Sequence, residues 1–287
     1  MKTLSISTKL LFIFTAMTFT FTACQKEETG TEETEREASE DLHIATIEDG
    51  NTQLMADQAE ASGDVSNLRL APSDGSSHAD ILGSCAVITK DTATSLRKIT
   101  IDFGTGCTGP NGVTRKGKII ITHTGRYRAE GTIIHIVSED YYVNDNKVDI
   151  NKTVENLGKN EQNNFEFKVK STRKVTFPNG KMSFSAVLKI KEWLVGAATP
   201  FDFSDDIFKV VGEGTHQSRR GVHYNFHTLT PLIRKVACRE FVSGELKIVR
   251  VTDERRFAIL NFGTGDCDDE ATVTLDNGRA FTIDLKH

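Results

Sequence analysis

From Ile81 to the end of the chain, apolar and polar residues alternate along many segments. Phe165–Val175 and Met182–Ile190 show this most clearly, with charged or hydroxyl-bearing residues between the apolar ones. Successive side chains of a strand point to opposite faces, so each segment would bury one face and expose the other. The pattern therefore predicts antiparallel strands. It puts Phe184, Leu188 and Ile190 on one common face and Trp193 on the opposite one, where it could face outward.

Turn signals separate many of these strands, and Asn-Gly between alternating apolar residues is the strongest local signal for a hairpin. The chain is therefore expected to be all-β and antiparallel. Its apolar face needs a cover. A second sheet would give a β-sandwich, whereas one extended, curved sheet could be closed by an N-terminal helix. The turn signals are Pro110-Asn-Gly112, Asn144-Asp-Asn146, Pro178-Asn-Gly180 and Asp276-Asn-Gly278.

Residues 24–80 have a different character. The first part of this segment is rich in Glu and nearly free of large apolar residues, which favours a disordered, solvated tether. A weak helical pattern at Asp49–Ala61 predicts a short helix within it. The β domain is then expected over 81–287.

The first 23 residues resemble a secretory signal. Lys2 and Lys9 precede the apolar run Leu10–Phe21, which is too short for the ~20 residues of a transmembrane span. Small residues and then Cys24 follow, a pattern that resembles the bacterial lipobox with Phe21 where leucine is usual. The resemblance implies that residues 1–23 are removed and that Cys24 becomes an acylated N-terminus carrying chains such as palmitate. A soluble secreted protein and a transmembrane helix are the alternatives.

Composition sets limits on partners. The chain has 287 residues with 38% hydrophobic residues, enough for a sizeable core. Without residues 1–23 it would keep 33 basic and 40 acidic residues, a net charge of −7. This charge argues against nucleic acid or anionic lipid as a partner. Attachment to a membrane would therefore come from the acyl chains.

A duplicated motif is the most specific feature of the β domain. Asp102–Cys107 reads Asp-Phe-Gly-Thr-Gly-Cys, and Asn261–Cys267 repeats it as Asn-Phe-Gly-Thr-Gly-Asp-Cys. A strand that begins at another cysteine, Cys85 or Cys238, comes first in each half; an apolar strand then leads into the motif, and one more strand follows it. The repeat divides the domain into halves of about 85–195 and 206–287. We interpret the glycines as a tight strand exit, since the helix and third glycine of a nucleotide-binding loop are missing.

The repeat also bears on the cysteines. With Cys24 acylated, four remain in an oxidising compartment, and sequence alone allows three pairings. The duplication selects Cys85 with Cys107 and Cys238 with Cys267. No pair has the C-x-x-C spacing of a zinc site.

The motif Asp-Phe-Gly-Thr-Gly-Cys107, the later strand at Arg115–Ile121 and Thr124–Tyr127 resemble a family of surface lipoproteins from Bacteroidota-type bacteria, mostly without assigned activity. The resemblance covers about residues 85–285 and implies a compartment rather than a mechanism. Lys26-Glu-Glu28 is similar to the signal that sends such lipoproteins to the cell surface. The alternative is retention on the periplasmic side.

The sequence shows no catalytic motif, which predicts a non-enzymatic protein without a cofactor or metal. We expect a lipid-anchored, outer-membrane protein with a structural or interaction role and a protein partner. The alternative is a carbohydrate- or ligand-binding module, in which Trp193 and Tyr141 or Tyr142 would line one exposed groove. Trp193 could instead be a core residue under the 194–207 loop.

Overall fold

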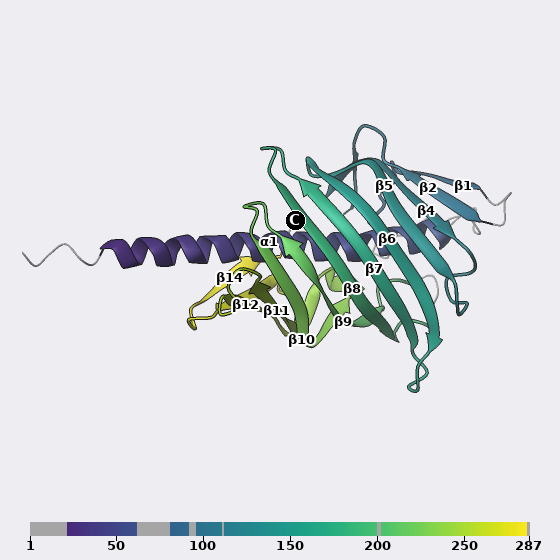
Figure 1. Ribbon diagram of the computed structural model, residues 1–287. Helices are drawn as coiled ribbons and strands as arrows, with labels where there is room; N and C mark the ends of the chain where they lie inside the picture. Colours follow the sequence, from purple (N-terminus) through teal and green to yellow (C-terminus); the bar gives the residue numbers. More distant parts are fainter. Residues whose placement is uncertain (1–21, 62–80, 92–95, 111, 200–201, 286–287) are drawn as a thin grey trace, which may run out of the picture.

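The computed structural model describes residues 22–61, 81–91, 96–110, 112–199 and 202–285, without the side chains of 22–31 and 61. One long helix precedes a series of strands (Figure 1). The elements are α1 (Thr22–Ala61), β1 (Val87–Asp91), β2 (Arg97–Asp102), β3 (Cys107–Thr108), β4 (Thr114–His123), β5 (Ile133–Val143), β6 (Asn146–Lys159), β7 (Phe165–Thr176), β8 (Met182–Val195), β9 (Ile207–Gln217), β10 (His223–Lys235), the 3₁₀ turn η1 (Val236–Cys238), β11 (Phe241–Arg250), β12 (Phe257–Thr264), β13 (Glu270–Leu275) and β14 (Ala280–Asp284).

The strands form one antiparallel sheet in the order β1-β2-β4-β5-β6-β7-β8-β9-β10-β11-β12-β13-β14, with the short β3 paired to β4. Each strand thus lies beside its neighbour in the chain, which short hairpin connections favour. The predicted all-β, antiparallel fold is confirmed.

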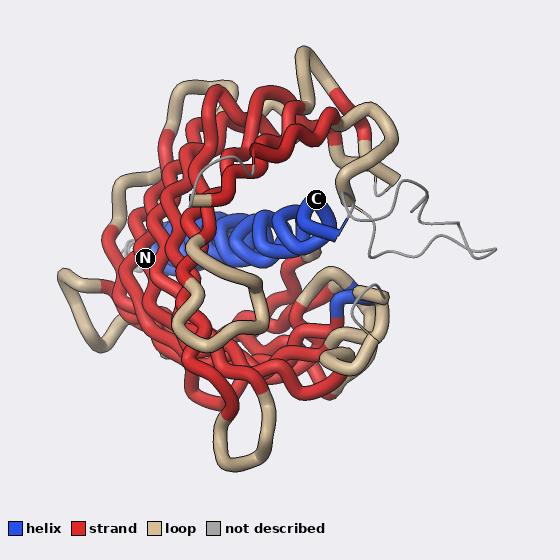
Figure 2. The backbone as a smooth tube through the Cα atoms, turned by 90° about the vertical axis from the view of Figure 1, so that its right-hand side faces the viewer, coloured by secondary structure: helices blue, strands red, loops and turns tan. Residues whose placement is uncertain are grey.

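The sheet curls around α1. Helix α1 contacts β2 and β13, near the two ends of the strand order, and also β7 and β8 in its middle. Seen along the helix, the strands form an open ring with α1 inside it (Figure 2). Of the two covers that the sequence allows, the structure therefore has the N-terminal helix rather than a second sheet.

The helix is far longer than the predicted 49–61. It has 40 residues, and most of its side chains from Glu35 onward are buried, including Asp41, Glu48 and Asp49. The expectation of a solvated tether is therefore wrong for the part of 24–80 that belongs to α1. Residues 62–80 lie outside the described residues. No described helix is both long enough and apolar enough to cross a membrane.

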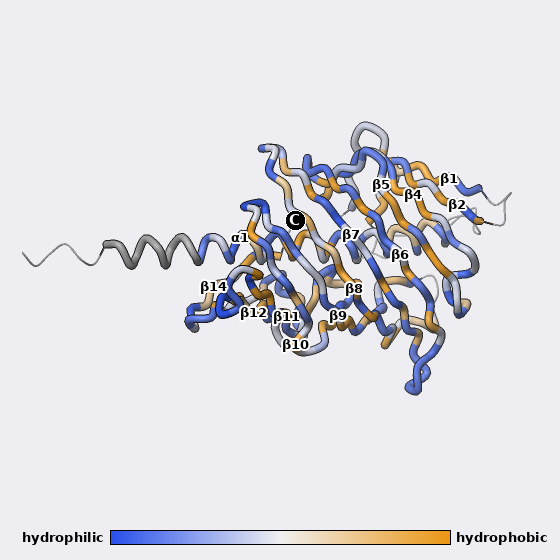
Figure 3. Tube along the Cα trace, in the orientation of Figure 1, coloured by the Kyte–Doolittle hydropathy of each residue, from blue (hydrophilic) through white to orange (hydrophobic). Residues whose placement is uncertain are grey.

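Two hydrophobic clusters divide the interior. Leu54, Met55 and Ala59 from the second half of α1 pack against inward residues of β2 to β8. Leu42 and Ile47 from its first half pack against β9 to β14. Hydrophilic and hydrophobic residues alternate along strands such as β6 and β7, as Figure 3 shows. The helix thus joins the two halves of the sheet into one body.

Both predicted disulfides are present. Cys85 is bonded to Cys107 and Cys238 to Cys267, with Cα–Cα distances of 5.6 and 5.3 Å. The two braced motifs lie towards opposite ends of the strand order, at β1-β2-β4 and at β11-β12-β13. Phe103 and Phe262, the aromatic residues of the two motifs, are both buried. The larger repeat halves, 85–195 and 206–287, stay a prediction.

The bend between β4 and β5 depends on Gly117. Its φ is +76°, and the register of the two strands shifts there. A Cβ at this position would lie 2.0 Å from the carbonyl oxygen of Asp140 on the neighbouring strand. Only glycine allows this close backbone approach.

We predict that Gly117→Ala lowers the free energy of unfolding by more than about 3 kcal/mol, because the added methyl group collides with backbone that cannot move freely. Gly278→Ala is the matched control, since its φ is +82° and no atom lies within 4 Å of the added Cβ. It should cost only about 1–2 kcal/mol of backbone strain. Urea unfolding followed by circular dichroism measures both, and equal losses would contradict the account.

Candidate functional site

The inner surface of the sheet carries a group of buried cations where it faces α1. Lys152 is 2% exposed and Arg173 is 3% exposed. Buried charges are rare in proteins unless they are paired. The group consists of Lys152 from β6, Arg173 from β7, Lys189 and Lys191 from β8, and Arg234 from β10.

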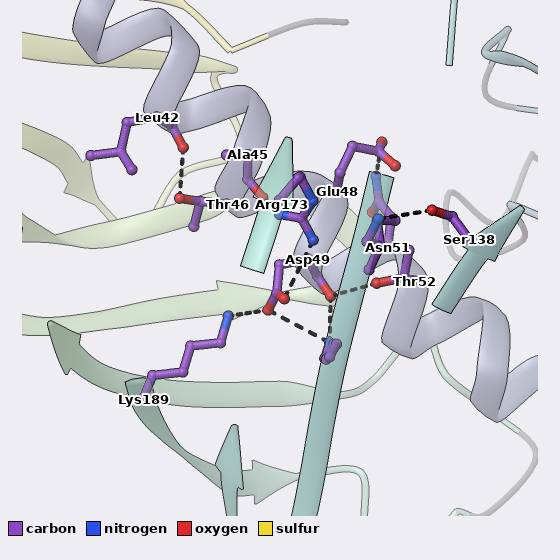
Figure 4. A network of polar contacts seen from close by, with 12 residues as sticks. Leu42, Ala45, Thr46, Glu48, Asp49, Asn51, Thr52, Ser138, Arg173 and Lys189 are labelled. Carbon is purple, nitrogen blue, oxygen red and sulfur yellow. Dashed lines mark hydrogen bonds and ion pairs between the residues drawn. The ribbon is translucent and has the colours of Figure 1, made fainter. Parts of the chain in front are cut away.

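Asp49, in the middle of α1, is the main anion of this group. Its carboxylate lies 3.5 Å from the Lys152 ammonium, 3.4 Å from the Arg173 guanidinium and 2.5 Å from the Lys189 ammonium. Lys152 also donates to the Asp49 carbonyl oxygen at 2.6 Å, and Arg173 donates to the carbonyl oxygen of Ala45. Figure 4 shows the Asp49 carboxylate between Arg173 and Lys189. One helical turn is thus held by three neighbouring strands.

The pKa of Asp49 reflects this enclosure. Burial alone would raise it, but the charges of Lys152, Lys189 and Arg173 lower it well below its ordinary value. Asp49 is therefore ionised at neutral pH, and the attraction of three cations holds its charge inside the protein.

Burial also shifts the pKa values of the lysines in this group. Burial lowers the pKa of Lys152 to about 7, because the positive neighbours add to the effect and Asp49 offsets only part of it. Burial likewise lowers the pKa of Lys191 to about 8. The second anion, Asp57, has its pKa raised by burial to about 6, against the opposing charge of Lys191. The inner faces of β6 to β8 therefore carry basic side chains that the acidic helix covers.

Ion pairs continue along α1 towards its N-terminal half. Arg219, in the β9–β10 turn, donates its backbone N–H to Asp41 at 2.7 Å and its Nε at 2.5 Å. The adjacent Arg220 lies 2.7 Å from Glu33 and 2.6 Å from Glu37. The Glu-rich sequence that suggested a tether is thus matched by arginines of the sheet.

A further pair lies between α1 and the C-terminal part of the chain. His43 Nε2 lies 3.4 Å from the Glu240 carboxylate and 3.2 Å from the carbonyl oxygen of Leu285. Burial raises the pKa of Glu240 to about 8, opposed by the nearby charge of Arg234. Glu240 is therefore protonated over much of the range below pH 8.

The spaces along the Asp49 cluster are small. Two cavities lie between α1 and the sheet, with volumes of about 40 and 30 Å³. Each has room for only a few water molecules and is far smaller than the roughly 300 Å³ of a small-molecule site. The cluster can fix the helix in place, but it has no room for a substrate.

The aromatic residues proposed as ligand contacts do not form an exposed groove. Trp193 is 6% exposed and donates its Nε1–H to Asp206 at 2.9 Å, in the loop after β8. Tyr141 is fully buried and its hydroxyl accepts from Arg115 Nε at 3.2 Å. Tyr142, the next residue of β5, lies on the opposite face of the sheet and is half-buried. The interpretation of Trp193 as a core residue under the loop is therefore the right one.

Trp193 also shows that the outward face of β8 was assigned wrongly from the pattern. Phe184, Leu188 and Ile190 are 43%, 40% and 36% exposed, whereas Lys189 and Trp193 point inward. The apolar residues of this strand face solvent, because its inner face pairs with a charged helix. In the sequence, the cationic residues at alternate positions of β6 to β8 were the signal that could have predicted this site.

No three His, Cys, Asp or Glu side chains of the described residues gather as metal ligands would. Two histidines of the adjacent strands β4 and β5 form hydrogen bonds: His123 Nδ1 lies 2.8 Å from the Gly125 carbonyl oxygen, and His135 Nδ1 lies 3.0 Å from the Thr153 hydroxyl. The side chain of Cys24 is outside the described part of the structure.

Asp49→Asn should lower the free energy of unfolding by about 3–5 kcal/mol, because it leaves three buried cations without their anion. Asp145→Asn is the control. Asp145 pairs with Lys116 at 3.4 Å on the surface, with its side chain 77% exposed, and should change stability by less than about 1 kcal/mol. Chemical unfolding of both variants tests this, and a loss at Asp49 no larger than at Asp145 would refute the structural role.

Glu240 should make stability depend on pH. The unfolded chain loses this proton near the ordinary pKa of 4.5, but the folded protein keeps it up to about 8. The folded state therefore binds more protons between these values, and its stability falls as pH rises. The charged or titratable groups facing Glu240 are His43 and Glu48 of α1, Arg234 of β10, and Arg239 and Asp269 of the loops.

The variant Glu240→Gln lacks this contribution of Glu240 to the pH dependence of stability. The stability of the wild type relative to the variant should decline by roughly 3 kcal/mol between pH 5 and pH 8. Urea unfolding at each pH provides the measurement. A difference that stays constant over the range would show that Glu240 does not titrate as the structure indicates.

Comparison with known proteins adds no relative. No family model matches the chain, and searches of curated proteins and of solved structures find no significant similarity. Function has to be argued from the residues themselves.

Proposed function

We propose that this chain is a lipid-anchored, non-enzymatic protein of the cell envelope, acylated at Cys24 and carrying a structural or interaction role at the outer membrane. The observation that supports it is the continuity of α1. The helix runs without interruption from Thr22, two residues before Cys24, into the centre of the sheet. A single element would therefore connect the lipid to the folded body.

This continuity changes the expected distance from the membrane. Among the described side chains of α1, the first to pair with the sheet are Glu32 and Glu33, with Arg279 at 2.5 Å and Arg220 at 2.7 Å. About eight residues separate Cys24 from these contacts, or roughly 12 Å of helix. A coiled tether of ~50 residues would instead span roughly 40 Å. The body would thus be held close to the bilayer.

The interior supports a role without catalysis. The buried charges around Asp49 hold α1 in place, and the two cavities beside them have room only for water. A carbohydrate-binding module would need Trp193 and Tyr141 or Tyr142 in an exposed groove, but Trp193 and Tyr141 are buried. An interaction surface on the outside of a rigid, braced sheet is the function that this geometry supports best.

Anchoring is tested with Cys24→Ala. The variant should move from the membrane fraction to the soluble fraction and should lose metabolic labelling by a fatty-acid analogue, because acylation needs the thiol. Thr31→Ala, in the same helix, should behave as the wild type. Membrane partitioning that survives Cys24→Ala would refute the anchor.

The same cells test orientation. Protease added to intact cells should remove the β domain of the wild type if the body faces outward. Digestion only after the envelope is opened would place it on the periplasmic side, and the surface proposal would then be abandoned while the anchor stands.

A further inference from the structure

A groove crosses the outer face of the sheet, on the side away from α1. Lys152, Arg173 and Lys189 point towards α1, so the residues next to each of them in the chain point outward, because successive side chains of a strand alternate. Residues of β6, β7, β8, β9 and β10 line the groove, and its volume is about 770 Å³. The view in Figure 1 is onto this face, since β6, β7 and β8 lie in front of α1. Unlike the small cavities beside Asp49, the groove has the volume of a small-molecule site.

The register of the strands places a cation and an anion in the groove on either side of an apolar residue. Lys170 of β7 lies opposite Leu188 of β8, and Leu188 lies opposite Glu213 of β9. Neighbouring strands are about 4.8 Å apart, so the backbones of Lys170 and Glu213 are separated by about 10 Å. Leu188, between them, is 40% exposed. The groove thus has a positive side, an apolar middle and a negative side.

Both charges are available to a ligand. Lys170 and Glu213 are exposed, and neither forms an ion pair with any residue that the structure describes. Lys174, on the same face of β7, pairs with Asp149 of β6 at 2.8 Å. Lys170 has no such acid beside it, because Thr153 and Leu188 are the residues opposite it on the two adjacent strands.

A second row of the groove offers hydrogen bonds. Asn151, Thr172, Ala186, Thr215 and Asn225 lie opposite one another on the five strands. Side-chain amides and hydroxyls both donate and accept hydrogen bonds. Within the described part of the chain, the four polar side chains of this row bond to no other residue. They can therefore bind a ligand that carries donors and acceptors along its length.

The two opposite charges select the class of ligand. A ligand with charges of one sign, such as a nucleic acid, would be attracted by one of them and repelled by the other. A molecule with an ammonium group at one end and a carboxylate at the other complements both. An extended peptide advances by about 3.3–3.6 Å per residue, so three residues span the distance between Lys170 and Glu213. The peptide groups between its ends each bring one donor and one acceptor to the second row.

We propose that this groove binds a short peptide with free termini, about three residues long. The C-terminal carboxylate accepts from Lys170, the N-terminal ammonium group donates to Glu213, and the central side chain lies against Leu188. The proposal names a ligand for the outer interaction surface and rests on that part of the proposed function. It does not depend on the lipid anchor, because every residue of the groove belongs to the sheet.

A ligand-observed NMR titration of the full-length protein in mild detergent tests the groove, with tri-alanine as the probe. The wild type should bind tri-alanine. N-acetyl-tri-alanine amide has the same length without the two charges, and free alanine has the charges without the length, so both should bind more weakly. The neutral sugar maltotriose should not bind.

Variants of the two charged residues identify the site. Lys170→Met and Glu213→Gln should each weaken the affinity for tri-alanine about threefold to fivefold, the range of a partly exposed ion pair. The reversal Lys170→Glu should weaken it by at least about tenfold, since it adds repulsion. Combining Lys170→Glu with Glu213→Lys should bring the affinity back above that of Lys170→Glu alone, because a cation and an anion again lie at the same spacing. Lys98→Met, at an exposed position of β2 outside the groove, is the control and should bind as the wild type.

The changed side chains are exposed, and circular dichroism checks that each variant is folded. The proposal is overturned if the wild type does not bind tri-alanine, if the blocked peptide or maltotriose binds equally well, if folded variants of Lys170 and Glu213 bind as the wild type does, or if the exchanged pair binds no better than Lys170→Glu. Because Cys24→Ala leaves the groove intact, that variant should bind tri-alanine like the wild type. A protein that stays anchored but does not bind the peptide would overturn the ligand assignment alone.

Discussion

Asp49 holds a negative charge inside the protein, enclosed by Lys152, Arg173 and Lys189 from three successive strands. Removing ions from water is expensive, and only close pairing with good geometry compensates for it. The main effect of these charges is therefore to determine where α1 lies in the sheet. They fix the depth and rotation of α1 in the sheet, because any other placement would leave buried charges unpaired.

The open shape of the sheet follows from this constraint. A sheet of this length can curl until it needs no second sheet, provided that something fills the interior. Here the filling is a helix that is polar on most of its surface, with apolar contacts concentrated at Leu42, Ile47, Leu54 and Met55. The two disulfides brace strands near the two ends of the strand order, where the pairing of neighbours is least extensive.

The same arrangement links the proposed anchor with the buried cluster. Among the described side chains of α1, Glu32 and Glu33 are the ones nearest to Cys24 that pair with the sheet, and Asp49 lies about four turns further along the same helix. One rigid element would thus carry both features.

The sequence by itself determined the β class, the hairpins and both disulfides, because alternation, Asn-Gly turns and a repeated motif are local signals. It did not reveal that Glu35 to Asp57 would be buried, since the same acidic residues suit solvent equally well. It also misplaced the faces of β8, where Phe184 and Leu188 are exposed and Lys189 is inside. Only the tertiary structure decided these points, because a buried charge depends on partners more than 100 residues away in the chain.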